Sequence, residues 1–164
     1  MFTKFQEKMG YAKLLKIVRT YRNAQDVIDI AGNFIQKNPT QIAKQLISPK
    51  NIDDPVIIYT YDSSYKKIGA DRRSGVLYAT ANAVETALSQ IIEYNYQAGK
   101  KDNGSILLLG RYGFDGDYLE RSGLFEYKTR GSKIKSVKYP QLDITFMTVH
   151  MAKGLGYDNV IVVN

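Results

Sequence analysis

The chain has 164 residues, and its 23 lysines and arginines against 16 aspartates and glutamates give a net charge of +7. It has no cysteine and one histidine, which excludes disulfide frameworks, thiolate metal sites, cysteine nucleophiles and histidine-rich metal centres. Because no apolar run approaches the ~20 residues that cross a bilayer, and the start lacks the apolar core of a signal peptide, we expect a cytoplasmic protein with no membrane partner. The charge fits either a solvated surface or a polyanionic partner.

Apolar runs in the first part of the chain predict alternating strands and helices. A short strand over 14–18 leads to a helix that Asn23 caps and that ends near Asn38, before a proline. We expect a shorter helix over 40–46. A run rich in valine, isoleucine and tyrosine over 56–61 predicts a buried strand.

The second part of the chain continues this alternation. A polar loop is expected over 62–76, ahead of the clearest helical face in the chain, which consists of Val84, Leu88, Ile91, Ile92 and Tyr96. Strands are predicted over 105–109, 144–148 and 160–163, with a helical turn over 115–119. Strands separated by helices indicate βαβ units, so we predict one α/β domain over 1–164 with a mostly parallel sheet flanked by helices. Such sheets bind ligands beyond the carboxyl ends of their strands.

Five basic residues precede the strand predicted over 144–148 and alternate with apolar and aromatic side chains. They are Lys128, Arg130, Lys133, Lys135 and Lys138. The alternation predicts an exposed β-ribbon or a strand at the edge of the sheet. Two interpretations stay open: an edge that lysines protect against aggregation, and a patch that follows nucleic-acid phosphates.

Several catalytic motifs are absent. The sequence contains neither the phosphate-loop pattern G-x-x-x-x-G-K-[ST] nor the dinucleotide fingerprint G-x-G-x-x-G. A Ser-His-Asp triad would have to use His150, and no serine lies in a nucleophile-elbow pattern. We therefore expect no metal site and no complete enzyme in this chain by itself.

The segment over 148–158 is the most informative in the chain and lies between two predicted strands. Thr148 and His150 at a strand end can donate hydrogen bonds to phosphate oxygens. Lys153 and Gly154 place a cation beside a residue that lets backbone N–H groups approach an anion. Chemistry alone leaves open an ordinary connection with a capping threonine.

The segment T-V-H-M-A-K-G-L-G-Y-D over 148–158 resembles motif V of the UvrD/Rep-type superfamily 1 DNA helicases. Residues 19–23, R-T-Y-R-N, with the amphipathic helix after them, resemble motif IV. The run over 106–110 followed by Arg111 is similar to an apolar strand of the family that ends in arginine. The interval between the two motifs lacks the large domain that many relatives insert there, which resembles the helicase IV-like members.

The resemblance implies the second RecA-like domain of such a helicase, a P-loop NTPase-type fold without its own phosphate loop. It implies that the chain is a piece of a longer protein, whose first RecA-like domain carries the phosphate loop and the Mg²⁺ ligands for ATP. Tyr21 would then stack on the adenine ring, and Arg22 would reach the γ-phosphate as an arginine finger. Lys153 and Gly154 would lie on the ATP side of the motif V loop.

The resemblance also implies contacts with DNA. Thr148 and His150 would contact the backbone of single-stranded DNA, and Arg111 would touch the DNA nearby. The expected activity is an ATP-dependent 3′-to-5′ DNA helicase serving DNA repair, with the isolated chain inactive. A non-motor RecA-like nucleic-acid-binding module stays the alternative, because Gly156 replaces the glutamate that the family places there to contact the ribose.

Overall fold

The computed structural model describes residues 5–10, 15, 17–41, 45–61, 72–129 and 132–163. The chain divides into two compact units, Met1–Ile58 and Tyr59–Asn164, which are described separately below. The expectation that residues 1–164 form one domain stays a prediction. Across the described ranges, no helix is long and apolar enough to cross a membrane.

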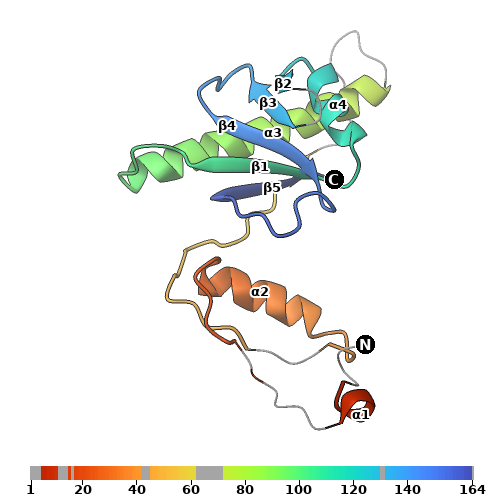
Figure 1. The fold of residues 1–164 in the computed structure, drawn as a ribbon. Helices are drawn as coiled ribbons and strands as arrows, with labels where there is room; N and C mark the ends of the chain where they lie inside the picture. Colours follow the sequence, from red (N-terminus) through yellow and green to blue (C-terminus); the bar gives the residue numbers. More distant parts are fainter. Residues whose placement is uncertain are drawn as a thin grey trace. The chain divides into compact units, whose positions relative to one another are not determined.

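The second unit is built on a five-stranded sheet (Figure 1). Its strands are β1 (Ser105–Gly110), β2 (Phe125–Thr129), β3 (Lys133–Ser136), β4 (Asp143–Thr148) and β5 (Asn159–Val163), in the spatial order β2-β3-β4-β1-β5. Strand β1 runs parallel to both β4 and β5, whereas β3 is antiparallel to β2 and β4. The sheet is thus mixed, with a parallel centre. This confirms the predicted α/β class and is consistent with a RecA-like fold.

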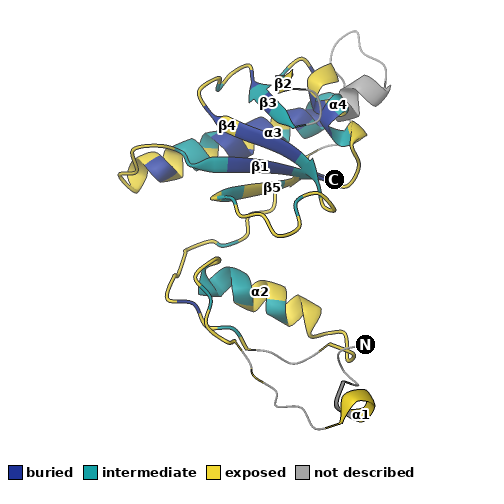
Figure 2. Ribbon diagram, in the orientation of Figure 1, coloured by how far each residue is buried: buried dark blue, intermediate teal, exposed yellow. Residues whose placement is uncertain are grey.

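Two helices of this unit, α3 (Arg72–Gln97) and α4 (Phe114–Arg121), pack against one face of the sheet (Figure 1). Parallel register places Ile106 beside Ile144 and Leu108 beside Phe146 on that face. The core cluster joins these strand residues to Val84 and Leu88 of α3 and to Leu119 of α4. Figure 2 shows the buried residues concentrated in the central strands and the helix surfaces that meet them. Burial of this continuous apolar layer is the main stabilising contribution to the unit.

Most predicted elements of the second unit are confirmed. The strands over 105–109, 144–148 and 160–163 correspond to β1, β4 and β5, and the helical turn over 115–119 is α4. Of the basic run, Lys128 lies in β2, and Lys133 and Lys135 lie in β3. These two strands form an antiparallel ribbon, called the basic ribbon, and β2 lies at the sheet edge.

Two expectations about α3 are wrong in detail. The helix begins at Arg72, so residues 72–76 are helical and do not belong to the loop predicted over 62–76. The remainder of that loop, 62–71, lies outside the described residues. Tyr96 is 84% exposed, whereas Asn95 is 3% exposed and donates its amide to the carbonyl of Asn103 (3.3 Å). The helical period brings position 95, seven residues after Leu88, onto the buried face and turns position 96 toward solvent.

The strand predicted over 56–61 is also wrong. These residues join no β-ladder within the described chain, and Val56, Ile57 and Ile58 are all more than half exposed. Apolar and β-branched side chains favour an extended backbone, but a strand also needs a partner for its N–H and C=O groups.

The first unit contains α1 (Phe5–Met9) and α2 (Gln25–Ile35). The residue at the N-cap of α2 is Ala24, not the predicted Asn23, and no side chain caps the helix. The helix ends at Ile35 rather than near Asn38, because the chain turns over 36–40. Instead of a cap, Gln25 binds the neighbouring segment: its amide donates to Leu46 O (3.2 Å) and accepts from Ser48 N (2.7 Å).

Two short elements predicted for this unit fall partly on residues outside the described ones. Of the strand over 14–18, residues 15, 17 and 18 are not in a strand, and a single parallel bridge joins Arg19 to Ile47 just beyond it. Of the helix over 40–46, residues 42–44 are outside the description, and Thr40 lies in a turn.

Gly116 of α4 generates a test of this packing. An alanine Cβ at position 116 would overlap the Tyr127 hydroxyl and lie 3.0 Å from the Phe146 ring. We expect Gly116→Ala to lower the free energy of unfolding by about 1–3 kcal/mol, measured by urea denaturation, because a packed core accommodates an added carbon poorly.

The matched control is Gly113→Ala at the N-cap of the same helix. Gly113 has a right-handed φ of −61°, and open space surrounds the position of its Cβ. The free energy of unfolding of the Gly113→Ala variant should stay within about 1 kcal/mol of that of the unsubstituted chain. Equal effects of the two substitutions would contradict the packing described here.

Candidate functional site

The carboxyl ends of β1 and β4 meet at one edge of the sheet. Gly110 and Thr148 are the last residues of the two strands and are register partners. The backbone N–H of Val149 donates to the carbonyl of Gly110 (3.1 Å), which joins the connections that follow the two strands. Arg111 and His150 each lie one residue beyond this bond. The structure therefore brings together the three residues predicted to contact DNA: Arg111, Thr148 and His150.

The connection after β4 folds into consecutive turns. The carbonyl of Thr148 accepts hydrogen bonds from the N–H groups of Met151 (3.0 Å) and Ala152 (3.1 Å), and Leu155 N donates to Ala152 O (3.1 Å). Gly154 has φ +88°, a left-handed conformation that other residues adopt only with strain. His150 and Lys153 are exposed. The turns thus present an imidazole and an ammonium group to solvent, where they can donate to phosphate oxygens.

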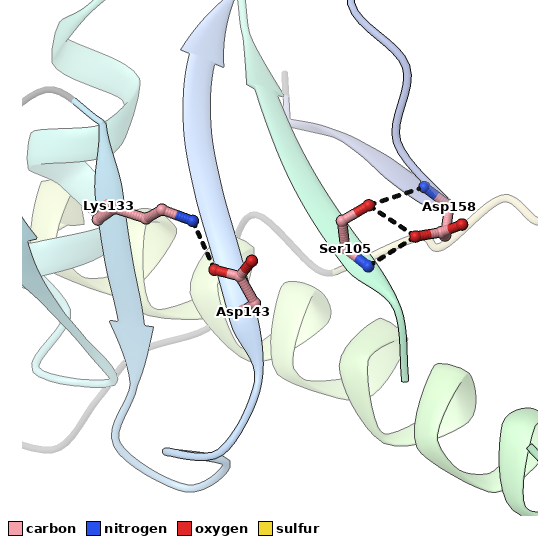
Figure 3. Close-up of polar contacts among 4 residues, drawn as sticks. All are labelled: Ser105, Lys133, Asp143 and Asp158. Atoms are coloured by element: carbon pink, nitrogen blue, oxygen red, sulfur yellow. Dashed lines mark hydrogen bonds and ion pairs between the residues drawn. The ribbon is translucent and has the colours of Figure 1, made fainter. Parts of the chain in front are cut away.

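Asp158, at the end of this connection, is hydrogen-bonded to Ser105 at the start of β1 (Figure 3). Its Oδ2 accepts from the backbone N–H (2.8 Å) and the hydroxyl (2.7 Å) of Ser105, while its own N–H donates to Ser105 Oγ (3.1 Å). Gly104 has φ +65°, and a Cβ there would lie 2.8 Å from Asp158 Oδ2. The start of β5 is thereby fixed to the start of β1.

The sequence does not predict these hydrogen bonds between Asp158 and Ser105, which together form the Asp158 clamp. Asp158 belongs to the motif V-like segment, but Ser105 lies 53 residues earlier. The signals present in the sequence are a glycine and a serine before one apolar run and an aspartate before another. Nothing in either signal indicates that the two runs are neighbours in the sheet.

Tyr21 and Arg22 lie in the first unit, in a bend before α2. Tyr21 is 61% exposed, and the guanidinium of Arg19 lies 5.7 Å from the centroid of its ring. Arg22 is exposed, and its N–H donates to Thr20 Oγ1 (3.4 Å). The exposed ring and guanidinium are suited to a base and a phosphate, respectively.

Each unit by itself offers only part of what an ATP–Mg²⁺ complex needs. The first unit has the aromatic ring of Tyr21 and the guanidinium of Arg22, and the second has the ammonium group of Lys153. Among the residues that the structure describes, no group of three or more histidine, aspartate or glutamate side chains could hold a metal ion.

The basic ribbon is partly neutralised. Lys133 Nζ lies 2.5 Å from Asp143 Oδ1 (Figure 3), and Lys135 is the cross-strand partner of Glu126. The ammonium of Lys138 lies 5.2 Å from the centroid of the Tyr139 ring. Lys128 is exposed, and Arg130 is outside the described residues. Because β3 lies between β2 and β4, these paired lysines are not at the sheet edge, and both interpretations of the basic run stay predictions.

The fold and the site thus define an α/β chain with donor groups gathered beyond the parallel strands. No family model and no solved structure matches the chain. The chain is 29% identical over 161 residues to DNA helicase IV of Escherichia coli (strain K12), a match that covers 98% of the chain and 18% of the relative. The chain is thus similar to a part of a DNA helicase, and that part makes up less than a fifth of the relative's length.

The Asp158 clamp generates a pH prediction. Hydrogen bonds from the backbone and side chain of Ser105 lower the pKa of Asp158 below its ordinary value, and nearby Lys100 adds to this. Because the folded pKa lies below the unfolded one, the contribution of the carboxylate to stability is complete above an unfolded pKa of about 3.9. It is lost as pH falls through the lower, folded pKa.

We therefore expect Asp158→Asn to lower the free energy of unfolding at pH 7, by about 1 kcal/mol for an exposed charge-assisted hydrogen bond. The difference from the original chain should shrink toward pH 2–3, as followed by urea denaturation across pH. Glu120→Gln, an exposed carboxylate on α4, is the control. A difference that does not depend on pH would contradict the assignment.

Proposed function

We propose that this chain is the second motor domain of an ATP-dependent DNA helicase. It would work with a first RecA-like domain that carries the phosphate loop and the Mg²⁺ ligands. The observation that carries the proposal is the similarity to DNA helicase IV, because it extends over 98% of the chain and not over one motif alone. The turns after β4, with their exposed His150 and Lys153, add local support.

On the nucleotide side, the proposal assigns a role to each exposed group. The Tyr21 ring would stack on the adenine base, and the Arg22 guanidinium would stabilise charge that builds on the transferring phosphoryl group. Lys153 and the backbone at Gly154 would contact the same nucleotide from the motif V loop. Bound ATP supplies the phosphoryl group whose transfer to water drives movement.

On the DNA side, Thr148, His150 and Arg111 would hold the backbone of a single strand at the carboxyl edge of β1 and β4. Side-chain donors at this edge of the sheet can hold DNA phosphates without reading the bases. Closure on ATP and opening after hydrolysis would move this edge along the strand. The direction proposed from the resemblance is 3′ to 5′, and the proposed pathway is DNA repair in the cytoplasm.

A non-motor nucleic-acid-binding module is the second candidate. Gly156 favours it, because a glycine cannot make the ribose contact of the glutamate in the UvrD/Rep-type motif. Such a module would bind single-stranded DNA without any role for Arg22.

The experiment replaces Arg22 by Ala in the protein that includes the phosphate-loop domain. We expect single-strand-stimulated ATP hydrolysis to fall by about 10³-fold or more, the effect typical of losing an arginine finger. Binding to single-stranded DNA should change less than about twofold, because Arg22 contacts the nucleotide alone. Steady-state ATPase rates and fluorescence anisotropy measure the two quantities.

Lys37→Ala, which removes an exposed cation of the same unit, should leave hydrolysis unchanged. Undiminished hydrolysis in Arg22→Ala would favour the non-motor module. Robust ATPase activity of the 164-residue chain alone would overturn the proposed division between two domains.

A further inference from the structure

Three exposed aromatic rings and an arginine follow β1. Tyr112 and Phe114 are stacked, with centroids 4.9 Å apart and an interplanar angle of 16°. Phe114 and Tyr118 are tilted at 53°, with centroids 5.3 Å apart. The guanidinium of Arg111 lies 5.2 Å from the Tyr112 centroid. The residues Tyr112, Phe114 and Tyr118 are 47%, 47% and 38% exposed, and their three rings form what we call the aromatic platform.

Local structure holds the platform in place. Asp115 Oδ2 accepts a hydrogen bond from the Tyr112 N–H (2.8 Å), which fixes the bend between β1 and α4. Phe114 and Tyr118 lie four residues apart on α4 and so share one helix face. The buried residues of this helix are Gly116 and Leu119, so the core does not account for the platform rings.

The position of the platform indicates what it contacts. Arg111 and Tyr112 follow directly on Gly110, whose carbonyl accepts the N–H of Val149 in the loop that carries His150. The platform and the loop with the proposed phosphate contacts therefore both begin at the hydrogen bond between Gly110 and Val149. Ring faces beside a guanidinium suit an unpaired base together with its phosphate.

We propose that the aromatic platform stacks unpaired bases of the single-stranded DNA whose backbone Arg111, Thr148 and His150 hold. The inference rests on the proposed function, since it requires a single strand at this edge. The platform can contact the DNA bases, which the residues that hold the DNA backbone do not. It requires no particular base sequence, because every base has a π-face. A duplex would not satisfy it, because its bases stack on each other.

The test compares two oligonucleotides of equal length bound to the 164-residue chain at low salt, one of thymidines and one abasic. Both carry phosphates, but the thymidine strand alone carries bases. Fluorescence anisotropy should give an affinity about tenfold or more higher for the thymidine strand, as expected for stacking on at least one base.

The double variant Phe114→Leu/Tyr118→Leu removes two rings but keeps apolar helix formers. It should lower affinity for the thymidine strand by about tenfold and leave affinity for the abasic strand unchanged. The control Phe114→Tyr/Tyr118→Phe keeps both rings and should bind both strands as the original does. Circular dichroism checks folding, and if the double variant unfolds, Tyr118→Leu alone replaces it.

The outcomes separate this inference from the proposed function. Equal binding of both oligonucleotides by the original chain would overturn the platform and leave the backbone contacts standing. Thr148→Ala should weaken both complexes by a similar factor. A folded double variant that loses both oligonucleotides equally would also overturn the platform, since the rings would then support the edge rather than the bases. Binding of neither oligonucleotide would overturn both proposals.

Discussion

The ring of Phe146 lies against Gly110 and Gly116, neither of which has a side chain. A Cβ on Gly110 would lie 2.9 Å from this ring, and a Cβ on Gly116 would lie 3.0 Å from it. Phe146 is buried on β4, Gly110 ends β1, and Gly116 lies in α4. Only glycines let the three elements approach this closely. The packing of β1, β4 and α4, which carry the platform and the motif V-like loop, therefore depends on one phenylalanine and two glycines.

Four aspartates among the described residues accept hydrogen bonds from backbone N–H groups in or beside loops. Asp115 accepts from Tyr112 N, Asp158 from Ser105 N, Asp26 from Ile52 N (2.9 Å) and Asp102 from Gly104 N (3.0 Å). Each bond satisfies a backbone donor in a loop or at the start of a strand. Charge-assisted bonds of this kind hold an irregular segment more firmly than neutral ones. In this way Asp115 holds the bend that carries Tyr112, and Asp158 holds the end of the motif V-like loop.

The three parallel strands could be predicted because β1 and β5 contain uninterrupted apolar runs over 106–109 and 160–163, and β4 combines Ile144, Phe146 and Met147 with β-branched threonines. The run over 56–61 has the same composition, yet no ladder forms there, because composition does not supply a neighbouring strand. The motif V-like loop was visible through its local pattern of threonine, histidine, lysine and glycine. The bond between Ser105 and Asp158 was not, because it depends on which strands become neighbours. The four-residue spacing of Phe114 and Tyr118 was present in the sequence, but the stacking of Tyr112 on Phe114 depends on a bend that Asp115 fixes.

The ion pair between Lys133 and Asp143 bears on how the chain responds to ionic strength. Each phosphate that a free cation neutralises releases condensed counterions from DNA, so the affinity falls more steeply with salt as more phosphates are contacted. A lysine already paired with a carboxylate releases few. Lys133 carries such a partner, and Lys135 faces Glu126 across the ribbon. Despite a net charge of +7, Lys133 and Lys135 should therefore contribute less to the slope of affinity against salt than exposed cations such as Lys128 and Lys153.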